Sequence, residues 1–381
     1  MTTAILFELN PSAGGSFSYS FDTCVDIIKR KKTKKIKLYC FHKSSIKFFK
    51  KKGIQAEYLS LSFIEKNVMR LLSFKIFRVL IVKTFFNFPI EDKLLKKNIK
   101  TILYPTLSKS VFFFKKINFF STVLDLCHIY HNRNFPEISK KEFSLKEDIH
   151  RYSFKRSLKI ITNSEEIRSQ INTRYKFKKK NIFILPFLPK NMNNSNIKSK
   201  IIKKKYSKYK RYLFYPAHLW SHKNHKIIID AANYIKKNNL NIDFLFSGID
   251  KGNKASLSNR IQHFGLKNII FLNFIEEKEI RYLYMNCLGV IMTSYFGPTN
   301  LPPLEAWFFD KPIIYNKSFQ NELGKNTCEF VNVDDYKDVA KSIIKVANNQ
   351  YSKTKLIKAK KQLRKINQDY RKKLNDLVTY L

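Results

Sequence analysis

The stretch Ser294-Tyr-Phe-Gly-Pro-Thr-Asn-Leu-Pro-Pro-Leu-Glu-Ala306 joins two apolar segments of this sequence. Residues 288–293 precede it and residues 311–315 follow it, and each segment is typical of a buried strand. The gap between the two strands fits a loop and one crossover helix, the usual connection in a parallel sheet. Because proline is favoured at the first position of a helix, we predict that this helix begins near Pro303.

The start of this helix is a candidate site for an anion. The first N–H groups of a helix lack partners within the helix and lie at its positive end, which favours phosphate groups. In doubly wound α/β folds, helix starts lie at the carboxyl edge of the sheet, where ligands bind. Glu305 falls in the first turn and can accept hydrogen bonds from hydroxyl groups. A glutamate that only complements the helix dipole explains this segment, taken alone, equally well.

Length and charge limit the class of protein. The 381 residues suffice for two domains of ordinary size. The chain carries 73 Lys and Arg against 29 Asp and Glu, a net charge of +44, which is common in proteins that bind nucleic acid, anionic lipid or other polyanions. The excess is scattered along the whole length, a pattern that AT-rich codon usage also produces. No RRM-like, OB-like or recognition-helix signature is visible, so we do not expect nucleic acid as a partner.

The cysteines and the apolar runs indicate the compartment. Neither a disulfide framework nor a zinc module is expected, because the cysteines are odd in number, far apart and free of any C-x-x-C motif: Cys24, Cys40, Cys127, Cys287 and Cys328. Glu8 interrupts the first apolar segment, which predicts a strand and not a signal peptide. No apolar run reaches the roughly 18 residues of a membrane span. We expect a cytoplasmic protein, with any membrane contact peripheral and on the inner face.

Apolar strands alternate with amphipathic segments along the chain, which is typical of parallel α/β sheets. In the first half we predict strands at residues 4–9, 35–39, 77–82, 100–104, 118–124, 158–162 and 181–185. In the second half we predict strands at residues 212–215, 243–246 and 268–272, beside the two around the opening stretch. The predicted domains are residues 1–190 and 211–350, with a polar, low-complexity linker at 191–210 and a basic helical segment at 351–381.

A second candidate binding segment follows the strand at 212–215. In Pro216-Ala-His-Leu-Trp-Ser-His-Lys-Asn-His225, Lys223 lies at the start of a predicted helix on the same sheet edge as the opening stretch. A cation at this position can neutralise a diphosphate, although an isolated lysine in so basic a chain is usually solvated surface. The three histidines of the segment have no carboxylate cluster nearby, so we expect no metal. Gly248, after the strand at 243–246, lets a loop pass close to a nucleotide, and packing alone explains it as well.

The first half holds polar residues at comparable positions. Asp125 and His128 follow the strand at 118–124, where they can orient a sugar hydroxyl or transfer a proton; a polar cluster that caps the next helix is the alternative. Gly14 and Gly15 form a turn after the first strand, suited to close approach of a substrate or another domain, but the full G-x-G-x-x-G fingerprint of dinucleotide binding is missing. Ser164 is a candidate helix cap at the same edge.

Together these motifs resemble the retaining glycosyltransferases of the GT-B fold, of the family 4 type. The resemblance runs over most of the chain, and its most specific segments are residues 215–225 and 296–306. Asp125-Leu-Cys-His128, Phe135-Pro-Glu137, Thr162-Asn-Ser164 and Gly14-Gly15 agree in order and spacing. The resemblance implies two Rossmann-like, doubly wound parallel-sheet domains that face a cleft. It implies a nucleotide sugar bound mainly to the second domain, an acceptor bound mainly to the first, and no required metal or cofactor.

The resemblance also implies roles for individual residues. The donor-binding residues are Lys223 for the diphosphate, Glu305 for the ribose hydroxyls, the backbone N–H groups of Asn300 and Leu301 for the distal phosphate, and Gly248 and His222 beside them. His128 and Asp125 are the catalytic candidates, which would position the transferred sugar. Gly14, Gly15 and Ser164 would lie on the acceptor side.

Three positions depart from the family pattern. Gly297 stands eight residues before Glu305, where the family places a second glutamate. Leu124 stands where many relatives have a histidine, and His218 where an arginine is usual. An inactive or strongly altered homologue is therefore one alternative function, and a polyanion- or nucleic-acid-binding protein driven by the net charge is another.

The expected reaction is retaining transfer of a sugar to a hydroxyl of a glycan precursor of the cell-surface polysaccharide or lipopolysaccharide type. A lipid-linked acceptor would bring the enzyme to an anionic membrane surface. The basic and aromatic segments at residues 45–52 and 110–120 are candidates for that contact, although many of their aromatic side chains also fit a protein core.

Overall fold

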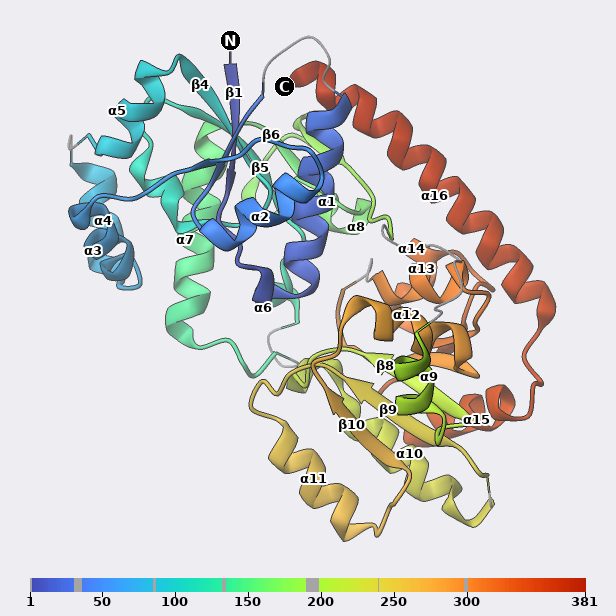
Figure 1. The fold of residues 1–381 in the computed structure, drawn as a ribbon. Coiled ribbons are helices and arrows are strands. Elements are labelled where there is room, and N and C mark those ends of the chain that lie inside the picture. Colours follow the sequence, from blue (N-terminus) through green and yellow to red (C-terminus); the bar gives the residue numbers. More distant parts are fainter. Residues whose placement is uncertain are drawn as a thin grey trace. The chain divides into compact units, whose positions relative to one another are not determined.

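The computed structural model describes residues 2–30, 36–84, 87–131, 135–189, 199–238, 240–297 and 301–381. They form two α/β units (Figure 1). Unit 1 comprises Met1–His128, Ile138–Phe187 and Asp369–Leu381, and unit 2 comprises Ile129–Glu137 and Leu188–Gln368. Each unit is built on one parallel sheet, as the alternation of strands and helices predicts.

The sheet of unit 1 has seven strands among the described residues, in the order β3-β2-β1-β4-β5-β6-β7, and all its pairs are parallel. The order reverses between β1 and β4, which is the arrangement of a doubly wound sheet. The strands are β1 Thr2–Phe7, β2 Lys37–Cys40, β3 Glu57–Tyr58, β4 Ile99–Tyr104, β5 Asn118–Thr122, β6 Ser157–Thr162 and β7 Ile182–Ile184.

The helices of unit 1 follow the strands in the sequence. They are α1 Gly15–Arg30, α2 Lys43–Lys51, α3 Phe63–Leu71, α4 Lys75–Lys83, α5 Pro89–Lys96, α6 Cys127–Tyr130, α7 Lys140–Arg156 and α8 Glu165–Tyr175. The strand predicted at residues 77–82 is wrong, because this segment is part of α4. A short, continuous apolar run has no period that separates a strand from a helix, and its exposure in the folded chain could not be seen in the pattern.

The core of unit 1 is strongly aromatic. Phe112, Phe113, Phe114 and Phe119 are at most 1% exposed and pack in one cluster with residues of β1 and β4. The segment at 110–120 therefore belongs to the core, and its aromatic side chains do not lie on the surface for a membrane contact. In the segment at 45–52, Phe49 is likewise buried, whereas Phe48 is 40% exposed.

The sheet of unit 2 has six strands among the described residues, in the order β10-β9-β8-β11-β12-β13, again all parallel. The strands are β8 Tyr212–Pro216, β9 Asp243–Ser247, β10 Ile269–Asn273, β11 Gly289–Met292, β12 Ile313–Asn316 and β13 Glu329–Val331. The order reverses between β8 and β11, so the loops after these two strands lie at the switch point, where ligands bind in such sheets.

The helices of unit 2 include the crossover helix of the opening stretch. They are α9 Lys200–Tyr206, α10 His225–Ile235, α11 Lys254–His263, α12 Glu277–Asn286, α13 Leu301–Phe308, α14 Gln320–Leu323 and α15 Tyr336–Ala347. Helix α13 begins at Leu301, two residues before the predicted start at Pro303, and contains Pro302 and Pro303 in its first turn. Prolines fit there because first-turn N–H groups have no partner within a helix. Helix α9 falls in the range predicted as a linker.

The last helix, α16, runs over Lys353–Tyr380. Its residues up to Gln368 belong to unit 2, where Lys355 forms an ion pair of 2.9 Å with Glu329. Its residues from Asp369 belong to unit 1, where the Tyr370 hydroxyl donates to Asp26 over 2.8 Å. Neither α16 nor any other helix in the described ranges is both long and apolar enough to cross a membrane.

Candidate functional site

Two loops meet at the carboxyl edge of the unit 2 sheet. Strands β8 and β11 are neighbours, with Leu213 opposite Gly289 and Phe214 opposite Val290. The loop at 217–224 follows β8, and the loop at 293–297 follows β11. Because parallel neighbouring strands end at the same edge, their loops lie side by side. The two most specific motifs of the sequence are therefore brought together by the sheet order.

Hydrogen bonds join these two loops. The Thr293 hydroxyl donates to the backbone carbonyl of Asn224 over 2.9 Å. The Tyr295 N–H donates to the carbonyl of His222 over 3.1 Å, and the His222 ring stacks on Phe296 with 4.3 Å between ring centroids. The loops at 217–224 and 293–297 thus form one cross-linked surface, which we call the floor. A shift of one loop would break its contacts with the other.

Lys223 stands on a rigid turn of this floor. It ends the short 3-10 helix Ser221–Lys223, and its carbonyl accepts the Tyr215 hydroxyl over 2.6 Å. Asn224 follows in the left-handed conformation with φ 53° and donates its side-chain N–H to the Val333 carbonyl over 2.9 Å. Helix α10 begins at the next residue. The half-buried Lys223 side chain therefore starts from a fixed backbone at the beginning of a helix, as the sequence predicts.

His218 occupies the position at which the resembling family usually has an arginine. Its Nδ1 accepts the N–H of Ile249 over 3.1 Å, so a neutral ring carries its proton on Nε2. Burial, and then the nearby cations Lys251 and Lys223, lower the pKa of His218. At neutral pH this residue offers one N–H donor and no positive charge, which leaves Lys223 as the cation of the turn.

Gly248 is required by the close approach of two loops. It has φ +140°, a conformation that side-chain-bearing residues rarely adopt. A Cβ at this position would lie 2.5 Å from the carbonyl oxygen of Ala217 and 2.7 Å from Cα of His218. The glycine lets the loop after β9 pack directly on the loop that carries Lys223, so it supports the floor through the backbone.

Glu305 lies in the second turn of α13 and is half-buried. Its Oε2 accepts the hydroxyl of Tyr284, from α12, over 2.5 Å. Burial raises the pKa of Glu305 to about 7, although the bond from Tyr284 opposes the shift. Within the described residues no second hydrogen bond to this carboxylate is present, so Oε1 can accept hydroxyl groups of a ligand.

Glu137 is a site residue that the sequence analysis did not select. Its Oε1 accepts the backbone N–H of His222 over 3.1 Å and lies 3.0 Å from Nδ1 of the same residue. The Phe135 ring packs edge-on against His222 at 5.1 Å. The motif Phe135-Pro-Glu137 therefore fixes the Lys223 turn from a third segment of unit 2. A signal was present in the sequence, because the motif was part of the resemblance.

The remaining predicted donor residues surround α13. Leu301 is the first residue of this helix and is half-buried, whereas Asn300 lies outside the described residues. Gly297 has φ 101°, and its carbonyl accepts the hydroxyl of Tyr315 over 2.9 Å. The residue that replaces the second glutamate of the family pattern thus lies in an anchored turn at this edge, in a conformation that glycine adopts readily.

The predicted catalytic residues of unit 1 lie in a closed polar cluster. His128 is 1% exposed, and its Nε2 lies 3.4 Å from Oε1 of Glu147 on α7. Burial alone would raise the pKa of Glu147, but hydrogen bonds with His128, Tyr175 and Arg174 outweigh it and hold the pKa well below its usual range. Asp125 accepts the N–H of Cys127 over 3.1 Å at the start of α6, which is the capping arrangement considered above.

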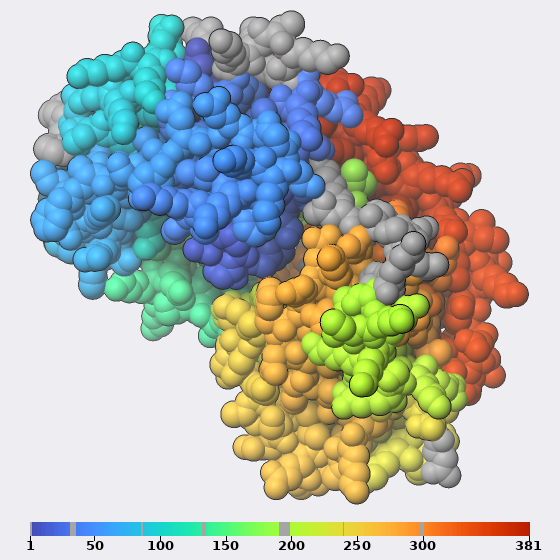
Figure 2. Space-filling model, in the orientation of Figure 1, coloured from blue at the N-terminus to red at the C-terminus, as the bar shows by residue number. Residues whose placement is uncertain are grey.

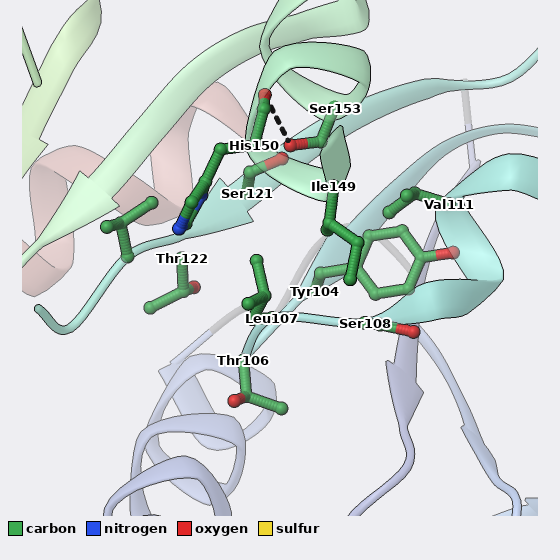
Figure 3. Close-up of a pocket in the computed structure, with 11 residues that line it drawn as sticks. Tyr104, Thr106, Leu107, Ser108, Val111, Ser121, Thr122, Ile149, His150 and Ser153 are labelled. Atoms are coloured by element: carbon green, nitrogen blue, oxygen red, sulfur yellow. Dashed lines mark hydrogen bonds between the residues drawn. The ribbon is translucent and has the colours of Figure 1, made fainter. Parts of the chain in front are cut away.

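A second buried histidine extends this cluster. His150 stacks on His128 with 5.7 Å between ring centroids, and burial lowers its pKa to about 3. Its ring and the hydroxyl side chains of Thr106, Ser108 and Thr122 border a small cavity at the ends of β4 and β5 (Figure 3). Nδ1 of His150 is buried and makes no hydrogen bond with the residues that the structure describes.

The predicted acceptor-side residues shape the ends of helices in unit 1. Gly14, with φ 62°, ends the 3-10 turn Pro11–Ala13, and α1 begins at Gly15. Ser164 is 2% exposed and caps α8, where its hydroxyl accepts the N–H of Ile167 over 3.2 Å. These residues set the loop shapes at the carboxyl edge of the first sheet.

Glu8, directly after β1, is a second residue that the sequence analysis passed over as a site. Its carboxylate accepts the hydroxyls of Ser108 over 2.6 Å and Ser110 over 2.5 Å. Burial raises its pKa despite these two bonds. The sequence contained a signal for this site, because Glu8 is an acidic residue at the carboxyl end of an apolar strand.

No group of three or more His, Cys, Asp or Glu side chains in the described part of the chain is arranged to hold a metal ion. His222 is engaged with Glu137, His218 with the backbone of Ile249, and His225 is buried against Tyr215. Each histidine of the Lys223 loop thus contacts a different protein group.

Residues 197–363 match the family model described as glycosyl transferases group 1. This match covers most of unit 2, including both loops of the floor. Residues 197–363 therefore form a glycosyl transferases group 1 domain, and the chain has the GT-B fold. No curated protein sequence matches it.

Solved structures of glycosyltransferases share the fold of this chain over its whole length. Anabaena Alr3699/HepE, crystallised in complex with UDP-glucose, superposes with a TM-score of 0.71 at 15% identity, covering 100% of both chains. The lipopolysaccharide outer core galactosyltransferase WaaB, in its apo form, gives a TM-score of 0.64 at 13% identity, covering 100% of this chain and 99% of that one. A glycosyltransferase from Rickettsia africae gives 0.66 at 14% identity, covering 100% and 97%. The predicted fold class is confirmed.

Proposed function

We propose that this glycosyltransferase moves a sugar from a nucleotide diphosphate sugar to a hydroxyl of a glycan precursor, with retention of configuration. The observation that carries the proposal is the cross-linked floor of unit 2, which places Lys223 and the start of α13 on the same sheet edge. The crystallisation of HepE with UDP-glucose and of TarM with UDP supports a nucleotide-linked donor and makes UDP the first base to test.

In the proposed complex, each donor group has a partner of suitable chemistry. Lys223 and the positive end of α13, with the N–H groups of Asn300 and Leu301, bind the diphosphate. Glu305 accepts the ribose hydroxyls through Oε1 while Tyr284 occupies Oε2. Gly248 and His222 keep the Lys223 turn in place. We propose that the reaction needs no metal and no cofactor.

The proposed chemical step is a front-face displacement. The bond between the sugar C1 and the leaving phosphate oxygen breaks as the bond between C1 and the acceptor oxygen forms on the same face. The proton of the acceptor hydroxyl passes to the leaving phosphate oxygen, so no enzymic nucleophile is required. Lys223 stabilises the negative charge that develops on the diphosphate, which is the main contribution expected of the protein.

We further propose an acceptor of the cell-surface polysaccharide or lipopolysaccharide type, bound mainly by unit 1 and presented at the cytoplasmic face of a membrane. The structural neighbour WaaG is described as a glycosyltransferase of lipopolysaccharide biosynthesis, which supports this class of acceptor. Asp125 and His128 remain the proposed residues that would position the transferred sugar. Gly14, Gly15 and Ser164 would shape the acceptor side.

The test is a thermal-shift panel with UDP, GDP, dTDP and ADP on the wild type, Lys223→Ala, Glu305→Ala and the matched control Lys226→Ala. Lys226 is an exposed lysine on α10, three residues from Lys223. One nucleotide at 100 times its Kd should raise the melting temperature of the wild type and the control by about 3 °C. Both site variants should show a smaller shift. A flat panel with a folded wild type would contradict the proposal and favour an inactive homologue.

A further inference from the structure

Helices α3 and α4 expose an unusual number of large apolar side chains. The residues that are 38 to 80% exposed within 63–83 are Phe63, Ile64, Leu71, Phe74, Ile76, Val79, Leu80 and Val82. The two helices lie together at one edge of unit 1, away from its sheet (Figure 1). In the space-filling view this light-blue region forms part of the outer surface of the unit (Figure 2). We call residues 63–83 the α3–α4 segment.

The fully buried residues of both helices are charged. Glu65 is 1% exposed, and its carboxylate accepts the N–H of Ser62 over 2.7 Å and that of Ile90 over 2.6 Å. Arg78 is 2% exposed and pairs with Asp148 of α7 over 2.8 Å. A helix on a water-facing surface normally buries its apolar stripe and exposes its charges. The α3–α4 segment has the reverse arrangement.

The inner side of the segment is firmly attached to unit 1. Leu72 is buried in the aromatic core, and Val68, Met69 and Ile81 pack against that core. Arg78 also donates to the carbonyl of Leu72 over 2.9 Å. The exposed apolar face is therefore held in place by contacts on the opposite side, and it is a fixed surface of the fold.

The exposed charges of the segment are all positive. Lys66, Arg70, Lys75 and Lys83 are exposed, and Glu65, the sole acidic residue of 63–83, is turned inward. From α7, Lys141 places its Nζ 3.7 Å from the centre of the Phe74 ring. Exposed apolar side chains with cations on the same two helices match the two layers of an anionic bilayer surface, acyl chains below and phosphate groups above.

We propose that the α3–α4 segment docks the protein on an anionic lipid bilayer. Its apolar side chains enter the interface, and its lysines and arginine contact lipid phosphates. An acidic protein partner would need matching carboxylates and a large dry contact, whereas a bilayer accepts any rigid apolar face with a basic rim. This surface lies outside the donor floor, so its lipid binding can be tested without reference to the nucleotide.

The experiment is co-sedimentation of the full chain with vesicles of phosphatidylcholine alone or mixed with phosphatidylglycerol, at low and high salt. We expect binding to the anionic vesicles, weakened by salt. The double variant Phe63→Ser with Ile76→Ser should bind them at least about tenfold more weakly, because it removes large apolar side chains from the interface. Lys75→Glu with Lys83→Glu should remove most of the salt-sensitive part.

The matched control is Ile201→Ser with Ile357→Ser. These isoleucines of unit 2 are 81% and 68% exposed, and their replacement should leave vesicle binding unchanged. Equal thermal unfolding of all variants would exclude a folding defect. The inference is overturned if the wild type does not bind anionic vesicles, or if the control loses as much binding as the α3–α4 variant. It is also overturned if sedimentation velocity shows a dimer that only the α3–α4 variant dissociates, since the occupant would then be a second copy.

Discussion

The two sheets end in polar residues at the same kind of edge, but these residues meet different environments. In unit 2, Lys223 and Glu305 are half-buried. The Lys223 carbonyl accepts the Tyr215 hydroxyl, and the Glu305 carboxylate accepts the Tyr284 hydroxyl. In unit 1, His128 and Glu147 are closed into a cluster with less than 10% exposure. Equal topology therefore does not make equal sites. The edge of unit 2 can receive a ligand, whereas the cluster of unit 1 holds its own fold together.

The largest effect is expected from a change at the edge of unit 2. Lys223→Ala should lower the rate of sugar transfer by about a hundredfold or more, since removal of one group that stabilises developing charge typically costs that much. Thermal stability should barely change, because the turn is held by hydrogen bonds that the side chains of Tyr215 and Asn224 donate to backbone carbonyls. Donor turnover by Lys226→Ala should equal that of the wild type. Equal turnover by both variants would contradict the assignment of Lys223.

A change in the cluster of unit 1 should affect stability instead. Glu147→Gln leaves His128 and Arg174 beside a neutral group, and we expect the free energy of unfolding to fall by about 3 kcal/mol. The exposed Glu165, paired with Arg168, gives the control Glu165→Gln, whose effect should stay below about 0.5 kcal/mol. Urea unfolding measures both. An equal effect in the two variants would show that the cluster is not structural.

The same carboxylate should make stability depend on pH. The pKa of Glu147 is lower in the folded protein than its ordinary value of 4.5. Its contribution is therefore fully present above the unfolded pKa and is lost as the pH falls below about 4.5. Melting temperatures of the wild type between pH 6 and 3 should fall more steeply than those of Glu147→Gln. Parallel curves would contradict this origin of the acid sensitivity.

Alanine substitutions at Gly248 and Gly15 compare the backbone constraints at the two sheet edges. Gly248→Ala forces a Cβ to 2.5 Å from the Ala217 oxygen at positive φ, and should destabilise unit 2 by about 2 kcal/mol. Gly15 meets nothing within 4 Å, so Gly15→Ala at the start of α1 should be neutral or stabilise by about 0.5 kcal/mol. Thermal unfolding of the two variants checks the difference, and a mild Gly248→Ala would show that the loops can separate.

A further comparison concerns the charge of Glu305. Its folded pKa of about 7 lies above the ordinary 4.5, so the unfolded chain releases this proton first. The group therefore makes wild-type stability fall as the pH rises from 4.5 to 7. Glu305→Gln should remove this decline and melt higher than the wild type at pH 8. A variant that keeps the wild-type slope would show that another group titrates.

Much of the fold followed from the pattern of the sequence, because parallel strands need continuous apolar runs and the loops between them need glycine and proline. The adjacency of the Lys223 and Glu305 segments could be predicted, since both follow strands at one switch point. The helical state of residues 77–82 could not, because a uniform apolar run carries no period. The links of Glu137 to His222 and of His128 to Glu147 depend on distant segments that only the folded chain brings together.

The central claim is that the donor site lies at the edge of unit 2 and depends on Lys223. It is tested most directly by titration calorimetry of the nucleotide that gives the largest thermal shift, with the wild type, Lys223→Ala and His128→Ala. The account predicts that Lys223→Ala weakens the nucleotide Kd by about tenfold or more, as loss of a charged phosphate partner should. It predicts that folded His128→Ala keeps the wild-type Kd. Unchanged binding by Lys223→Ala, or a loss confined to His128→Ala, would contradict it.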